Sequence, residues 1–142
     1  MRMRKFVFFT FLMMLFTLCE AQDKKFSPEK FEAELADYVT KEAKLTDEEV
    51  AKYFPLLREM HNKQRCIYNK KRNLGKEKPA SEEGCAAAIR ERDKLEIELK
   101  QLEQSYHKKM MQVISAAKLY DCINAENRFH RQKMKGWQKG KH

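Results

Sequence analysis

The chain has few of the residues that interrupt helices: only four glycines and three prolines occur in 142 residues. Helices can therefore run long. No segment shows the strict alternation of apolar and polar side chains that is typical of a half-buried strand. The sequence also lacks a Gly-rich phosphate loop, an HExxH zinc motif, a GxSxG nucleophile motif and a CxxC pair. We therefore expect an all-α protein that is not an enzyme.

Charged side chains are abundant and positive charge is in excess. They make up 36% of the chain, and the net charge is +9 at pH 7. Such a field attracts anionic partners, including nucleic acid, lipid head groups and acidic or unfolded polypeptides. Large apolar side chains are too sparse for a thick core, so a thin helical layer or a homodimer would bury them better.

The first 21 residues have the pattern of a signal peptide. Three basic residues among the first five precede an apolar run from Phe6 to Leu18, and Ala21 ends a small-residue cleavage pattern. We expect residues 1–21 to be removed and the mature chain to begin near Gln22. An exported protein rarely meets nucleic acid, so we do not expect a nucleic-acid partner.

Cys19 raises the alternative of a lipoprotein. A lipobox needs a small residue directly before the cysteine, and this chain has Leu18 there. We therefore do not expect lipidation. No later apolar stretch is long enough to cross a bilayer, which argues against stable membrane insertion.

The spacing of apolar residues predicts one helical domain over residues 22–135, followed by a basic disordered tail over 136–142. Its helices are expected at 28–44, 47–74 and 82–113, with a fourth that begins after Ser115. Ser27 should cap the first helix, and Pro55 should bend the second without ending it. The third carries a coiled-coil-like seam of Leu95, Leu99, Leu102, Tyr106, Met110 and Val113.

Two helix starts share one design. Thr46 follows Leu45 and can form a capping box with Glu49. Ser115 follows Ile114 and can cap the last helix in the same way. Each start precedes a long, charged, amphipathic run.

Three cysteines follow the expected cleavage site. Cys66 and Cys85 flank the turn at Gly75, so an antiparallel helix pair could join them in a disulfide and leave Cys122 free; the alternative is three buried thiols. The weak candidates for zinc or another transition metal are His61, Cys66, Cys122 and His130. Their spacings of five and eight residues suit a metal site poorly, so we expect no metal cofactor.

The two helix starts, with the charged helix through Arg58, His61 and Arg65, resemble the Spy/CpxP family of exported bacterial proteins, known for LTxxQ motifs. Glu49 and Lys118 stand where the motif has Gln, and Ser115 stands where it has Thr. The resemblance implies a bent four-helix hairpin that pairs into a thin, cradle-like antiparallel dimer in the periplasm. Family members are ATP-independent chaperones, envelope-stress regulators or metal-responsive proteins.

The resemblance favours a periplasmic chaperone or envelope-stress protein that binds unfolded or misfolded envelope proteins on a basic and apolar helical surface. The alternative is a metal-responsive sensor, or a regulator that docks on an envelope sensor or anti-sigma protein. The candidate residues for client binding are Arg58, Met60, His61, Arg65, Arg128 and Phe129.

Overall fold

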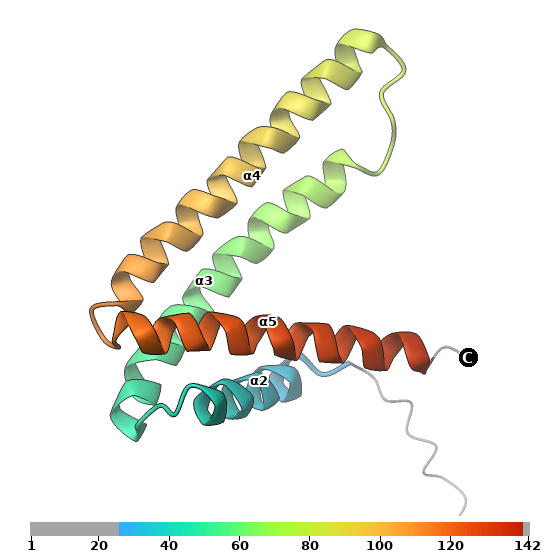
Figure 1. The fold of residues 1–142 in the computed structure, drawn as a ribbon. Coiled ribbons are helices and arrows are strands. Elements are labelled where there is room, and N and C mark those ends of the chain that lie inside the picture. Colours follow the sequence, from blue (N-terminus) through green and yellow to red (C-terminus); the bar gives the residue numbers. More distant parts are fainter. Residues whose placement is uncertain (1–25, 141–142) are drawn as a thin grey trace, which may run out of the picture. The chain divides into compact units, whose positions relative to one another are not determined.

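A computed structural model describes residues 26–140 as four helices, with no strand in this range. They are α2 (Pro28–Glu42), α3 (Asp47–Leu74), α4 (Glu82–Met110) and α5 (Ala116–Lys139) (Figure 1). The all-α, four-helix prediction is confirmed. The predicted signal peptide and Cys19 lie outside the described residues.

Packing divides the chain within α2, between Glu32 and Ala33. In the described residues before this division, the Ser27 hydroxyl accepts a hydrogen bond from the backbone N–H of Lys30 at 3.3 Å. Ser27 therefore caps α2 as the sequence predicts. The rings of Phe26 and Phe31 lie 5.7 Å apart between centroids.

From Ala33 onward, the helices α3 and α4 form an antiparallel pair. Ile67 on α3 packs with Leu95 and Leu99 on α4, and all three side chains are at most 5% exposed. The Gln64 amide donates to the Glu103 carboxylate at 3.1 Å, which aligns the two helices at this level. Tyr106 and Met110 extend the buried row towards the end of α4, so the predicted seam is the packed face of this helix as far as Met110, and Val113 lies beyond the helix end.

The helix α5 packs against α3 and against the part of α2 that follows Ala33. The Phe129 ring lies 5.6 Å from the Tyr38 ring of α2, and His61 of α3 contacts Glu126 of α5 at 2.7 Å. Cys122 and Ala125 are fully buried on the same face of α5. No charged residue among the described ones is fully buried.

The observed boundaries correct the sequence prediction in three places. The helix α5 continues to Lys139, so residues 136–139 are helical and not the predicted disordered tail. A single helical glycine costs only about 1 kcal/mol, and the Gly136 carbonyl still accepts the Gly140 N–H at 3.2 Å. The helix α4 ends at Met110, short of the expected 113, and α2 ends at Glu42, short of the expected 44. The helix α3 runs without interruption through Pro55, as expected.

We predict that Leu99→Ala lowers the free energy of unfolding by about 2–5 kcal/mol, because it leaves a cavity in the α3–α4 seam. Urea denaturation followed by circular dichroism measures this change. Ile97→Ala is the matched control: it lies two residues away and is 59% exposed, so its effect should stay within about 0.5 kcal/mol. Equal effects of the two substitutions would contradict the packing described here.

Candidate functional site

Both predicted helix starts are capped as the sequence indicates. The Thr46 hydroxyl accepts from the Glu49 N–H at 3.3 Å, and the Glu49 carboxylate accepts from the Thr46 N–H at 2.9 Å. This reciprocal pair is the expected capping box. At the second start, the Ser115 hydroxyl accepts from the Lys118 N–H at 3.2 Å. Leu45 and Ile114, the aliphatic residues before the two caps, are both buried.

The two helix starts meet in space. The Lys118 ammonium lies 2.5 Å from the Glu49 carboxylate and also donates to the backbone carbonyl of Lys44 at 3.2 Å. The hydrogen bond from Lys118, followed by that from the Thr46 N–H, lowers the pKa of Glu49. Glu49 and Lys118, the fourth residue from Leu45 and from Ile114 respectively, are therefore partners. We name Thr46, Glu49, Ser115 and Lys118 the cap junction.

Lys44 supports the cap junction through an unusual backbone conformation. It is the one described non-glycine residue with a positive φ, at 51°, a left-handed geometry that costs a residue with a Cβ about 1–2 kcal/mol. This conformation ends α2, because the Leu45 N–H then reaches the Thr40 carbonyl at 3.1 Å. The sequence gives no signal for it, since glycine or asparagine is usual at such a position.

We predict that Glu49→Gln and Lys118→Gln each lower the melting temperature, and that the double variant loses less than the sum of the two. Each single change leaves one charge unpaired, whereas the double variant places Gln at both motif positions. The difference should shrink in high salt because ions screen the pair. The control is Glu48 and Lys52, an exposed pair at 2.7 Å, for which the single effects should add. Additive effects at Glu49 and Lys118 would show that the pair does not couple the two helices.

A second polar cluster joins α3 and α5 at Glu126. Its Oε1 atom lies 2.7 Å from Nε2 of His61 and 3.6 Å from Nε2 of His130. Burial alone would raise the pKa of Glu126, but the hydrogen bonds and charges of His130 and His61 outweigh burial and lower the pKa to about 2. The carboxylate is therefore charged across the physiological pH range.

Tyr53 and Cys122 lie beside this cluster and are nearly or fully buried. Burial, followed by the influence of Cys122 and Glu126, raises the pKa of the Tyr53 hydroxyl. Burial also raises the pKa of the Cys122 thiol to about 11. Both groups are therefore neutral at physiological pH, and the Cys122 thiol has little thiolate character for metal binding or nucleophilic attack.

We predict that Glu126 makes the fold sensitive to acid. Because its pKa in the folded state lies below the usual 4.5, its contribution to stability is complete above about pH 4.5 and is lost as the pH falls towards 2. Glu126→Gln should lower stability at pH 6 and flatten the loss between pH 4.5 and 2, as measured by urea denaturation at a series of pH values. Glu42→Gln, at an exposed ion pair with Arg128, should leave this acid profile unchanged. An unchanged profile for Glu126→Gln would contradict the assignment.

The structure corrects the predicted disulfide, because Cys66, Cys85 and Cys122 are free thiols. The α3–α4 alignment places Cys66 beside Gln101, with which it lines a shallow groove. Cys85 lies sixteen residues earlier on α4, roughly 24 Å away along the helix, whereas a disulfide needs Cα atoms within about 7 Å. The Cys85 thiol instead donates to the Pro79 carbonyl at 3.4 Å.

The weak metal candidates do not come together as one ligand set. His61 and His130 share Glu126, Cys122 is buried beside Tyr53, and Cys66 faces the groove on the α3–α4 pair. In residues 26–140, no group of three or more His, Cys, Asp or Glu side chains is placed to hold a metal ion.

The candidate residues for client binding fall into three groups. Arg58 and Arg65 are exposed on α3. Met60 and Phe129 are only 5% exposed and belong to the core, contrary to expectation, because helical spacing alone does not show which apolar face is covered. Of the other two candidates, His61 contacts Glu126, and Arg128 pairs with Glu42 at 2.8 Å.

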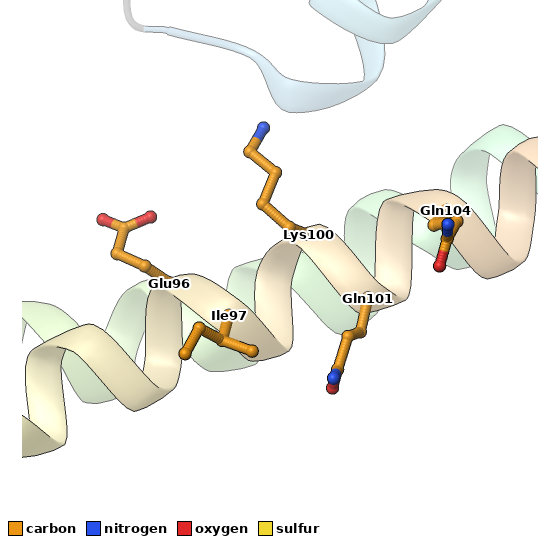
Figure 2. A pocket seen from close by; sticks show the side chains of 5 residues that line it. All are labelled: Glu96, Ile97, Lys100, Gln101 and Gln104. Carbon is orange, nitrogen blue, oxygen red and sulfur yellow. The ribbon is translucent and has the colours of Figure 1, made fainter.

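The outward face of α4 is the apolar feature that the sequence reading missed. Ile89 and Ile97 are 60% and 59% exposed. The charged side chains that line the surface around Ile97 are of both signs: Arg90, Lys94 and Lys100 with Asp93, Glu96 and Glu98. Two shallow, open depressions that share Ile97 and Gln101 run along this face. Figure 2 shows the side chains that line one of them, and all five project from α4 alone, with α3 behind it. Such a surface can contact an extended chain but does not enclose a small molecule.

Comparison with known proteins finds no matching family model, no curated protein with significant similarity and no similar solved structure. In the part of the chain that the structure describes, every helix is too short or too polar to cross a bilayer.

Proposed function

We propose that the protein is a Spy/CpxP-like binding protein of the periplasm that holds unfolded or misfolded polypeptides without ATP. The observation that carries the proposal is the outward face of α4, where Ile89 and Ile97 stay exposed among charged side chains of both signs while the opposite face packs on α3. Positive charge attracts unfolded chains at long range, and exposed aliphatic groups then make contacts of low specificity.

The size of this surface suits weak, reversible binding. Full burial of an isoleucine side chain contributes about 1.5–3 kcal/mol, and each of these two is already partly covered. Two such contacts, with screened charge attraction around them, would hold a client for a short time and release it without an energy source. Met60 and Phe129 are part of the core, so we assign client contact to Ile89 and Ile97 in their place.

The cap junction supports the likeness on which the proposal rests. Two copies of one short motif, far apart in the sequence, contact each other through Glu49 and Lys118, the residues that replace Gln. Contact between the two copies explains why both would be needed for the fold. The opposite charges of Glu49 and Lys118 explain how these residues could stand in place of two Gln residues. Association into a homodimer belongs to the same proposal, and light scattering at tens of micromolar protein would measure it.

We predict that the protein suppresses aggregation of several chemically denatured clients at substoichiometric ratios, without ATP. Ile89→Gln with Ile97→Gln should at least halve this suppression at equal concentration, because the exposed aliphatic contacts are removed while helix propensity is kept. Light scattering of the diluted clients gives the readout.

The matched control is Met111→Gln with Tyr120→Gln, which removes two exposed apolar side chains outside the outward face of α4. This variant should suppress aggregation as well as the unchanged protein does. No suppression of any client at several-fold excess would overturn the proposed function. Equal loss in the two double variants would show that α4 is not the client surface.

A further inference from the structure

A stretch of α3 carries positive charge without any carboxylate. From Met60 to Lys76 the chain has six Lys and Arg residues and no Asp or Glu. Two of the cations are compensated by neighbouring carboxylates: Lys63 pairs with Glu59 at 3.2 Å, and Lys71 pairs with Glu96 of α4. Of the other cations, Lys70 lines the shallow groove between α3 and α4, whereas Arg65 and Arg72 lie on the side of α3 away from Ile67.

Three arginines form a row along this outer side. Arg58, Arg65 and Arg72 are seven residues apart, so they repeat about every 10.5 Å on the side of α3 away from Ile67. All three are exposed. Asn62 and Asn69 lie between them and are also exposed, and Asn69 accepts a hydrogen bond from the Arg72 guanidinium. We name Arg58, Arg65 and Arg72 the arginine row.

The chemistry of the row suits phosphate. A guanidinium donates two parallel hydrogen bonds to a phosphate group, and neighbouring amides can donate to the remaining oxygens. Tyr68, an aromatic residue beside the row, is 50% exposed, and the Lys71 ammonium lies 5.8 Å from its ring centroid. A single ring gives less stacking surface than the successive aromatic side chains on which single-stranded nucleic acids stack their bases.

Because the arginine row is straight, it fits a membrane surface better than a nucleic-acid duplex or a single polypeptide chain. Phosphates of a duplex wind around its axis, so a straight helix on its outside meets them only where they cross it. A polypeptide would need carboxylates spaced to match arginines about 10.5 Å apart. Lipid head groups diffuse laterally, so a membrane can bring a phosphate to each arginine whatever the spacing.

We propose that the outer side of α3 docks on an anionic phospholipid surface through the arginine row. The contact is peripheral and electrostatic, because the apolar face of α3 is occupied by α4 and cannot enter the bilayer. Each cation near an anionic bilayer contributes about 1 kcal/mol, so three can hold the protein at the surface reversibly. The proposal is independent of client binding, which we place on the opposite side of the α3–α4 pair.

Vesicle flotation tests the proposal. The full reading frame is expressed, and the protein is purified in the form that the host produces. Vesicles of equal parts phosphatidylglycerol and phosphatidylcholine are compared with vesicles of phosphatidylcholine alone, which report any binding through apolar segments. We expect at least tenfold stronger partitioning to the anionic vesicles, and loss of this excess in 0.5 M NaCl, where charges are screened beyond about 4 Å.

Two triple variants distinguish the contribution of the arginine row to vesicle binding from the contribution of net charge. Arg58→Gln with Arg65→Gln and Arg72→Gln should remove most of the excess binding. Arg131→Gln with Lys135→Gln and Lys139→Gln removes the same charge from exposed positions on α5 and should retain most of it. Should the triple α3 variant misfold, Arg65→Glu with Arg72→Glu gives the same test with Arg58 left in place, and circular dichroism checks the fold of each.

The proposal is overturned by equal partitioning to the two kinds of vesicle, or by equal losses in the α3 and α5 variants. It is also overturned if single-stranded RNA or polyglutamate binds through the row more tightly than the anionic vesicles do. Ile89→Gln with Ile97→Gln should bind vesicles normally, because these side chains lie outside the arginine row. Failure of either proposal can thus be recognised without the other.

Discussion

The alignment of α3 with α4 is the constraint on which the other features depend. Once Ile67 packs between Leu95 and Leu99, every residue on the two helices has a fixed level and a fixed direction. The alignment separates Cys66 from Cys85, and it turns Ile97 and Arg65 outward from the two sides of the same pair. The seam consists of aliphatic and aromatic side chains whose burial stabilises the pair, and the hydroxyl of Tyr106 also donates to the Glu59 carboxylate of α3 at 2.6 Å.

The pair is also held at its edges by contacts between residues far apart in sequence. Gln64 with Glu103 and Lys71 with Glu96 join α3 to α4, while His61 with Glu126 joins α3 to α5. The two contacts between α3 and α4 are partly exposed, so each contributes little stability. Glu126 differs, because a mostly buried carboxylate must keep its partners or bear the full cost of burial. The α3–α5 contact therefore depends on one group more than the α3–α4 contact does.

Features that involve residues close together in the sequence could be predicted, whereas contacts between residues far apart in the sequence could not. The capping box at Thr46 and the seam of α4 follow from residues within a few turns of one another, so spacing identifies them. The Glu126 cluster joins positions 61 and 126, and nothing in the sequence indicates that α5 crosses α3 at that level. The same lack of information explains the error at Met60 and Phe129, where an apolar residue on an amphipathic helix could be either core or surface. At Gly136 a local signal was too weak, since one glycine does not end a helix that is otherwise favourable.

The contact between Glu49 and Lys118 bears on how such chains are recognised. If two Gln positions touch in the folded protein, their identities are not independent, and a pair of opposite charges can replace a pair of amides with little change in geometry. A sequence pattern that requires Gln at each position separately would reject this chain at both positions, although the acid and the base that stand there contact each other. A pattern that scores the two positions jointly, and accepts either two amides or an acid with a base, would describe the fold more faithfully than one written for each helix start alone.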